Sequence, residues 1–438
     1  MAHAFLRFAG RSFPCGLAFC AAFAFPGAAG AAAADDPAGP AISLRGFGTL
    51  GAVHASERNA DFVGGFFQPN GAGHTHRWAL GVDSKLGVQV DARITEQLSA
   101  TLQLVGQHRY DNSYTPQVEW ANLKYRVTPD LDVRFGRTVT MPFMVSDSRL
   151  VGYSNPWIRP PQEVYGLIPL TNKDGVDATY RIHIGDVTNA IHTSYGQTSA
   201  RLPASGKVTA KHYFDISNTV EYGPASVRAS YSTGRVDLHT PALDTLIAGL
   251  TQFGNAASAL PPFAAAGAQS LGLAQKYRFE DAPISIIALG ASYDRDRWLL
   301  MAEWARFNGH SLLADSTAWY ATGAYRIGAF TPYLTLARLK PDRGAEPGIT
   351  AAGLPPPLAA TATALNTGLN TAIAGATFGQ RSLAAGLRWD FMKNTSLKLQ
   401  YDRVNLDAGS SGRLGNVQPG FQSGGNVHVF SVAVDFVF

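Results

Sequence analysis

The sequence has little charge for its length. Charged residues make up 16% of the 438 residues, whereas hydrophobic residues make up 46%. A typical soluble domain carries about 25% charged residues, so this fraction is low for a soluble surface. The formal net charge of +4, with no long run of like charges, gives no basis for a nucleic-acid partner.

Cysteine is almost absent. The only two, Cys15 and Cys20, lie near the N-terminus, inside a segment that has the pattern of an export signal. A chain cut after that segment has no cysteine at all. This excludes a secreted domain that depends on disulfides for its stability.

The N-terminal segment has the three parts of a secretory signal peptide. Arg7 and Arg11 come first, an apolar stretch over 13–28 follows, and small residues then continue to position 34. The pattern predicts a signal peptide over 1–34, removed by cleavage. An uncleaved anchor and a lipoprotein signal are the alternatives. Two prolines in the apolar stretch argue against the first, and the bulky residue before Cys20 argues against the second.

Long apolar runs are missing from the rest of the chain. No later segment has 18 consecutive apolar residues, so no transmembrane helix is predicted. The chain alternates instead. Over 77–91, even positions are mostly apolar, such as Trp78 and Leu80, and odd positions are mostly polar, such as Asp83 and Lys85. A period of two predicts a β-strand with one apolar face.

About sixteen such strands are predicted, each long enough to cross a bilayer at a tilt. They cover 42–53, 77–91, 97–109, 116–126, 130–138, 174–184, 187–197, 211–222, 225–236, 283–294, 297–308, 315–327, 329–340, 380–391, 395–406 and 426–438. Tight turns alternate with long segments, notably 54–76, 139–173, 237–282 and 341–379. This predicts an all-β, antiparallel transmembrane barrel over 35–438, with short periplasmic turns and long extracellular loops. A soluble propeller or sandwich requires more equal loops or a regular repeat, which the sequence lacks.

The chain ends inside a strand pattern. In FSVAVDFVF, Phe430, Phe436 and Phe438 lie on one face together with two valines, and small or polar residues lie on the other. Lipid buries such an apolar face, and closure of a barrel removes the free edge that a terminal strand otherwise leaves.

The signal peptide, the opening strand ISLRGFGTLG, the alternation of turns and loops and the terminal phenylalanine together resemble a proteobacterial general porin. The resemblance implies an outer-membrane homotrimer of 16-stranded barrels, each with a water-filled channel for passive diffusion of small hydrophilic solutes and ions. It implies no enzyme activity and no cofactor or metal. It also implies that the barrel-assembly machinery reads Phe430, Phe436 and Phe438, and that outer-membrane lipid surrounds the barrel.

In that family the third long loop folds inward and forms the constriction. The matching segment is 139–173, in which Asp147 and Glu163 are the candidate acidic groups. The acidic PEFGG-like stretch of many family members is missing here. Arg149 and Arg159 lie in the same segment and complicate a purely acidic loop.

Strand parity predicts which charged side chains face the channel. The predicted basic residues are Arg45, Lys85, Arg109, Lys124, Arg134, Arg181, Arg228, Arg326, Arg388 and Lys398, and the predicted acidic residues are Asp83, Asp177, Glu303 and Asp402. Each of them alone fits pairing across neighbouring strands, but together they predict water inside the barrel. Their basic excess predicts a mild preference for anions. Arg45, Arg109 and Arg134 are expected to face the acidic groups of the inward loop across the constriction.

Two alternative functions remain. A substrate-specific channel, possibly anion-preferring, requires an aromatic slide or a ladder of like charges, and the basic residues fit such a ladder. A barrel enzyme such as an outer-membrane phospholipase requires an outward Ser-His pair. The match of GFGTLG to the dinucleotide fingerprint lies within a strand, without the helix that the fingerprint requires. Ala359 to Ala374 is expected to form short helices at the outer rim.

Overall fold

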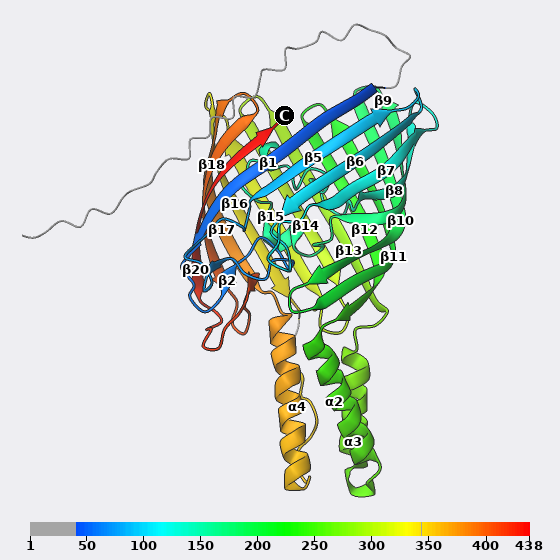
Figure 1. Ribbon diagram of the computed structural model, residues 1–438, viewed down its shortest axis with the longest axis vertical. Coiled ribbons are helices and arrows are strands. Elements are labelled where there is room, and N and C mark those ends of the chain that lie inside the picture. The colour runs from blue at the N-terminus through cyan, green and yellow to red at the C-terminus, as the bar shows by residue number, and fades with distance from the viewer. Residues whose placement is uncertain (1–40, 343) are drawn as a thin grey trace, which may run out of the picture. The chain divides into compact units, whose positions relative to one another are not determined.

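The computed structural model describes residues 41–342 and 344–438, and the signal peptide expected over 1–34 lies outside them. The described chain forms one large antiparallel sheet of 17 strands and a small sheet of three. One of the 17, β4 (Trp78–Ala79), has only two residues, and the other sixteen form the wall of a closed barrel (Figure 1).

The wall strands are β1 (Ala41–Ala55), β5 (Lys85–Arg93), β6 (Leu98–Gln107), β7 (Gln117–Arg126), β8 (Leu131–Val139), β9 (Asn172–Ile184), β10 (Val187–Leu202), β11 (Gly206–Tyr222), β12 (Ala225–His239), β13 (Ala282–Arg295), β14 (Trp298–Asn308), β15 (Ser316–Tyr325), β16 (Phe330–Pro341), β17 (Gln380–Met392), β18 (Thr395–Leu406) and β20 (Asn426–Val437). Each pairs with the next in antiparallel register, and β20 pairs with β1 to close the barrel. The predicted sixteen-stranded barrel is confirmed.

Three predicted strands differ from the observed ones by more than a few residues. The strand expected over 77–91 is divided into β4 and β5 by an irregular segment over 80–84. There the Ser84 hydroxyl accepts a hydrogen bond from the Gly51 amide at 3.0 Å, in place of a backbone carbonyl. The strands β10 and β11 are longer than expected. Their pairing continues past an irregularity near Gly196 and ends in a three-residue turn.

The two ends of the barrel differ in their connections. Links of two to four residues, such as 185–186, 223–224 and 393–394, lie at the end where β1 begins and β20 ends; this end is called the turn rim. Gly185 and Gly223 have φ values of 57° and 53°, a conformation that glycine adopts without strain in tight hairpins. The connections 140–171, 240–281, 342–379 and 407–425 lie at the opposite end, which is called the loop rim.

The small sheet lies within the connections of the loop rim. It consists of β2 (Asp61–Phe62), β3 (Ala72–Gly73) and β19 (Leu414–Gly415). It therefore links the connection after β1 to the connection before β20, on the loop-rim side of the closure. The predicted alternation of short turns and long loops is confirmed.

The glycines of the opening strand make room for the last strand. A Cβ atom on Gly46 would lie 2.1 Å from the Phe438 ring, and one on Gly48 would lie 2.3 Å from the Phe436 ring. The backbones of Gly46 and Phe438 also exchange hydrogen bonds of 2.8 and 3.0 Å. The glycine motif therefore serves the closure of the barrel, and it opens no nucleotide-binding helix.

The outer face of the barrel is apolar. Large exposed side chains on it include Ile42, Leu44, Leu50, Phe135, Ile184, Leu289, Leu334 and Leu336. Aromatic contacts lie near both rims, with Trp298–Tyr325 and Phe330–Trp389 at the turn rim, and His54–Trp78, Tyr195–His212 and Tyr401–His428 at the loop rim. An apolar band between two aromatic levels matches the hydrocarbon layer and the two interfaces of a bilayer.

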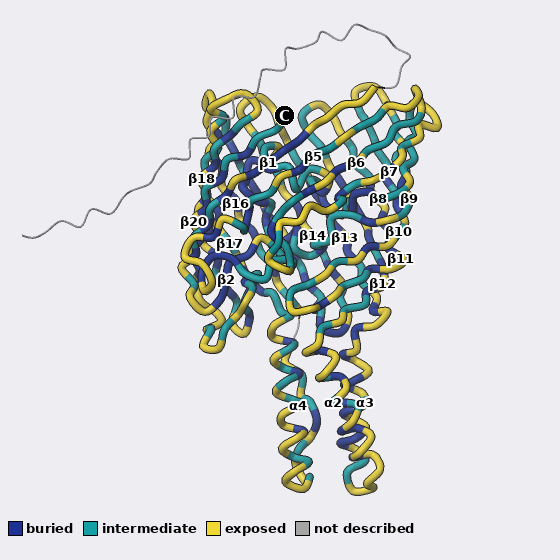
Figure 2. The backbone as a smooth tube through the Cα atoms, viewed as in Figure 1, coloured by how far each residue is buried: buried dark blue, intermediate teal, exposed yellow. Residues whose placement is uncertain are grey.

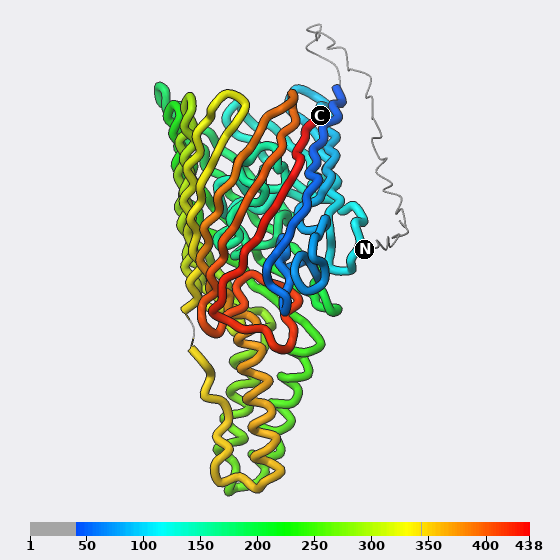
Figure 3. The backbone as a smooth tube through the Cα atoms, turned by 90° about the vertical axis from the view of Figure 1, so that its left-hand side faces the viewer, coloured from blue at the N-terminus to red at the C-terminus, as the bar shows by residue number. Residues whose placement is uncertain are grey.

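Three helices extend from the loop rim, away from the barrel (Figures 1 and 3). They are α2 (Pro241–Ser258), α3 (Ala264–Tyr277) and α4 (Pro356–Gly375), and a 3-10 turn, η2 (Pro261–Phe263), joins the first two. The helix expected over 359–374 is one continuous helix of 20 residues rather than several short ones. None of the described helices is long and apolar enough to cross a membrane.

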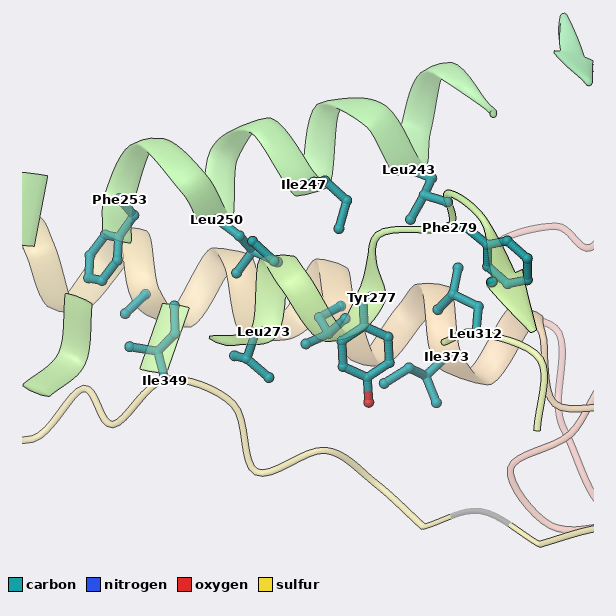
Figure 4. Packing of buried hydrophobic residues seen from close by; sticks show 14 of the residues in the cluster. Leu243, Ile247, Leu250, Phe253, Leu273, Tyr277, Phe279, Leu312, Ile349 and Ile373 are labelled. Atoms are coloured by element: carbon teal, nitrogen blue, oxygen red, sulfur yellow. The ribbon is translucent and has the colours of Figure 1, made fainter. Parts of the chain in front are cut away.

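The helices share an apolar core that continues into the barrel mouth (Figure 4). Leu250 of α2 and Leu369 of α4 are fully buried, and Leu273 of α3 packs in the same cluster. Thr240 caps α2 by accepting the Leu243 amide at 3.2 Å, and Pro241 follows at the first helical position. These contacts make the helices a packed extension of the loop rim.

Closure predicts a specific sensitivity at Gly48. In the Gly48→Ala variant the added methyl group overlaps the Phe436 ring, so we expect a loss of about 1–3 kcal/mol in the free energy of unfolding. The measurement is the urea midpoint of the folded barrel, followed by heat-modifiable mobility on gels. Gly323→Ala, in β15, is the control, because its nearest side-chain atom lies 3.7 Å from the added methyl group. Equal midpoints for the two variants would contradict this account of the closure.

Candidate functional site

The connection over 140–171 folds into the barrel. It contains a 3-10 turn, η1 (Gly152–Ser154), and a short helix, α1 (Gln162–Tyr165), and it is called the inward loop. Side chains of several wall strands contact it, among them β14 and β18. Most of its residues from 155 to 165 are buried, and Figure 2 marks buried residues in dark blue. The prediction for 139–173 therefore differs from the observed loop by only two residues at its end and one at its start.

Arg159 joins the inward loop to one wall. Its guanidinium donates to both carboxylate oxygens of Asp83 at 2.9 and 2.6 Å, to Asp402 at 3.4 Å and to the Ser431 hydroxyl at 2.7 Å. The Arg159 side chain is 9% exposed and the Asp83 side chain 3%. Burial alone lowers the pKa of Arg159, but the charges of Asp83 and Asp402 outweigh it and hold that pKa above its ordinary value.

Lys398 holds the middle of the loop. Its ammonium group donates to the carbonyls of Gly152, Asn155 and Trp157 at 2.7, 2.7 and 2.9 Å. The same nitrogen lies 2.9 Å from the Asp435 carboxylate, and both side chains are fully buried. The three donors of the ammonium are therefore used to fix loop backbone, and Asp435 balances the charge.

Arg388, on the neighbouring strand β17, binds the backbone of the same part of the loop, around η1. Its guanidinium donates to the carbonyls of Tyr153 and Asn155 at 2.6 and 3.1 Å and to the Asp390 carboxylate at 2.8 Å. The Arg388 guanidinium also lies 4.6 Å from the centroid of the Tyr153 ring. Two inward cations that parity predicts, Arg388 and Lys398, thus bind the loop backbone rather than line open water.

The neighbouring strands β13–β16 hold the loop through a carboxylate and an apolar cluster. Glu303 accepts the Met144 amide at 2.9 Å and the hydroxyls of Tyr165 and Tyr320 at 2.5 and 2.8 Å. The Trp157 indole donates to two threonine hydroxyls of β15 and β16 at 3.0 Å. Loop residues of this cluster pack against inward-facing residues of the wall, including Ile286, Ala288, Ala305, Phe307 and Ala318. The inner face of β13–β16 is therefore dry where the loop covers it.

A polar cavity of about 460 Å³ lies inside the barrel towards the turn rim. Four basic side chains, Arg45, Arg93, Lys124 and Arg134, and one acidic side chain, Asp91, line it. It is called the basic cavity. Arg45 pairs with Asp91 at 2.5 Å, and Arg134 pairs with Asp177 at 2.7 Å.

The two predicted acidic groups of the loop lie elsewhere. Asp147 borders a void of about 10 Å³ between the loop and β7, next to Glu119. Glu163 is 3% exposed and accepts the Gln380 side-chain amide of β17 at 2.7 Å. Neither carboxylate faces Arg45 or Arg134.

Arg109 also differs from its expected place. Strand β6 ends at Gln107, so Arg109 lies in the connection at the loop rim, where it donates to the Thr115 carbonyl at 3.2 Å. Its guanidinium lies 5.4 Å from the centroid of the Tyr110 ring. Arg109 therefore does not lie beside Arg45 and Arg134 on the inner face of the wall, because strand parity does not continue past the end of β6.

The other predicted residues lie in the wall. Lys85 begins β5, within electrostatic range of Asp83 and Asp435. Arg181 pairs with Asp132 at 2.8 Å. Arg326 follows β15 at the turn rim and pairs with Asp294 at 2.6 Å, outside the constriction.

The predicted assembly signature lies on the outer face. Phe430 is 41% exposed and contacts Trp78, and the rings of Phe436 and Phe438 are stacked 6.4 Å apart. All three rings therefore lie on the apolar side of the closing strand.

The role of Arg159 is not among those that the sequence predicts. The available signal was indirect: Asp83 and Asp402 are inward carboxylates on segments far apart in the sequence, and such groups need a cation when they are buried. Only the closed register shows that one guanidinium of the loop reaches both.

A family model and several solved structures are similar to this chain. A family model described as Gram-negative porin matches residues 17–410. No curated protein is significantly similar to the chain.

Solved structures share the fold at low sequence identity. DcaP, an outer membrane channel of Acinetobacter baumannii, is 13% identical, with 91% of this chain and 98% of that chain covered and a TM-score of 0.53. An anion-selective porin from Comamonas acidovorans is 13% identical, with 91% and 100% covered and a TM-score of 0.50. The trimer form of OmpT, an outer membrane protein of Vibrio cholerae, is 11% identical, with 91% and 100% covered and a TM-score of 0.50.

The anchoring of the loop predicts a local effect of Arg159. In Arg159→Met the buried Asp83 and Asp402 lose their shared cation, at a cost of about 3–5 kcal/mol, so amide hydrogen exchange over 150–165 should become roughly a hundredfold faster. The matched control is Arg137→Met, which breaks a more exposed pair with Asp174 whose loss costs about 0.2–1 kcal/mol. Unchanged exchange in Arg159→Met would show that this guanidinium does not hold the loop.

Proposed function

This chain belongs to the Gram-negative porin family and forms an outer-membrane channel for passive diffusion, and we propose that the channel prefers anions. The turn rim then faces the periplasm, and the loop rim with its three helices faces the outside, as in outer-membrane barrels generally.

The basic cavity carries the proposed preference. Four cationic side chains and one carboxylate line it; Arg45 pairs with that carboxylate, Asp91, and Arg134 pairs with Asp177. Low-dielectric walls focus the field of such a cluster, which raises the local concentration of anions over that of cations. The anion-selective porin from Comamonas acidovorans, which has the same fold, supports the proposal.

We propose further that the protein is a homotrimer whose assembly depends on the C-terminal aromatic face. The trimer form of a barrel with the same fold supports the oligomeric state. Phe430, Phe436 and Phe438 project from the closing strand into the lipid, where the barrel-assembly machinery would read them. The signal peptide over 1–34 is part of the same proposal, since export must precede this assembly.

A channel without catalysis fits the described residues better than a barrel enzyme. The phospholipase alternative requires a serine beside an outward histidine at the lipid boundary. Two exposed histidines, His212 and His428, instead bond to the hydroxyls of Tyr195 and Tyr401, each at 2.7 Å. A substrate-specific channel remains the second candidate, because the basic cavity would also bind an anionic solute.

The charge of the basic cavity should set the ion preference. In Lys124→Glu the lining loses one cation and gains one anion, so we expect the anion-to-cation permeability ratio to fall roughly threefold or more. The measurement is the reversal potential of the folded protein in a planar bilayer across a salt gradient.

Lys393→Glu is the matched control for Lys124→Glu. It makes the same change in charge in an exposed turn between β17 and β18, outside the cavity. Clear cation preference of the unaltered channel, or equal shifts in the two variants, would contradict the proposed role of the basic cavity.

A further inference from the structure

A second cavity lies on the other side of the inward loop and has the opposite chemistry. It has a volume of about 200 Å³. Loop residues 166–170, the loop-rim ends of β10–β12 and the residues where the helices join the barrel border it. Apolar side chains such as Leu167, Val236, Leu339 and Phe279 form its lining. Phe279 also belongs to the helix core, where Figure 4 shows it at one end. This space is called the apolar vestibule.

The vestibule exists because, between the membrane and the loop rim, the inner faces of the strands become apolar and their outer faces become polar. Nearer the turn rim, the inner face of β12 carries Arg228 and Ser230. Nearer the loop rim, the same face carries Val236 and Leu238. The outer face changes in the reverse sense. There Arg235 and its neighbours form exposed ion pairs and hydrogen bonds, as between Lys211 and Asp237.

An apolar cavity in the mouth of a water-filled channel is not explained by bulk diffusion. Water gains few hydrogen bonds there, so an apolar solute that enters releases this water and gains contact with the lining. The volume exceeds the 150 Å³ of an engineered protein cavity that binds benzene. The vestibule is therefore large enough for one aromatic ring with a small substituent.

One cation borders the vestibule. The guanidinium of Arg413 contacts the rings of Phe66 and Phe378, 5.2 and 4.9 Å from their centroids, and these two rings also meet each other edge to face. Its Nε is enclosed without a hydrogen-bond partner, and no carboxylate of the described residues lies within ion-pair distance of it. Burial lowers the pKa of Arg413 to about 10, against the opposing charge of Glu163, and the group stays cationic at neutral pH.

We propose that the apolar vestibule binds small monocarboxylates with an aromatic body, the ring in the apolar space and the carboxylate on Arg413. Planar guanidinium groups bind carboxylates through two parallel hydrogen bonds, and Arg413 has donors that no described carboxylate uses. Two aromatic rings already contact the guanidinium and restrict its movement, so little freedom is lost when the anion binds.

The role of this site in transport rests on the proposed anion-preferring channel, but the binding itself does not. An aromatic carboxylate entering from outside would meet the vestibule before the basic cavity. The site would therefore concentrate one class of anion at the mouth of the channel.

Calorimetric titration of the full folded protein with benzoate, benzyl alcohol and acetate tests the site. We expect benzoate to bind at least tenfold more tightly than either partial analogue, since only benzoate has both the ring and the charge. Arg413→Gln should weaken benzoate binding at least about tenfold and leave benzyl alcohol nearly unchanged. Ala314→Leu, which fills part of the cavity from the lining, should weaken both aromatic probes.

The control is Arg278→Gln, which removes an exposed arginine of the same rim that pairs with Glu280 outside the vestibule. Its benzoate affinity should equal that of the unaltered protein. The inference is overturned if acetate binds as tightly as benzoate, or if Arg413→Gln and Ala314→Leu bind benzoate as tightly as the unaltered protein does. Benzoate binding without anion-selective current would instead overturn the proposed function and leave the site standing.

Discussion

The absence of water in the bilayer core is the constraint on which this structure depends. Every backbone amide and carbonyl of the wall must find a partner within the protein, so the sheet has to close. Closure brings residues from the two ends of the chain together, and Gly46 and Phe438 exchange backbone hydrogen bonds there. The glycines of β1 follow from this meeting, because two phenylalanine rings of β20 occupy the space that side chains on β1 would fill.

Closure with sixteen strands creates the next problem, since wall side chains alone do not fill so wide a barrel. The inward loop fills much of the space, and its backbone needs partners where little water reaches it. Lys398 and Arg388 supply donors to loop carbonyls, Glu303 accepts a loop amide, and one loop cation, Arg159, neutralises two wall carboxylates. Many inward charges of this barrel therefore position the inward loop. Only the other inward charges, such as those of the basic cavity, are available to a solute.

The sequence predicts the wall well because lipid and water impose opposite demands on alternate residues. That contrast places every long strand to within a few residues, apart from the break over 80–84 and the extensions of β10 and β11. It fails for Arg109 because parity has no meaning beyond a strand end. It also fails for the partners of Arg159, whose carboxylates come from strands that only the closed register brings together. The helix cluster was underestimated because its core combines two loops that are about 100 residues apart.

The alternation of inward polar and outward apolar residues also fails between the membrane and the loop rim, for a different physical reason. The rule of a polar inside and an apolar outside holds only where lipid surrounds the wall, and beyond the bilayer each face is free to take the other character. On β12 this freedom gives an inner face of Val236 and Leu238, and the inward loop separates that space from the basic cavity below. Two spaces of opposite chemistry then lie within one barrel, and on the proposed route of a solute they follow one another. A purely apolar solute gains nothing in the basic cavity, and a small inorganic anion gains nothing from the apolar lining. An anion with an apolar body interacts favourably with both, so the order of the two cavities itself discriminates among solutes.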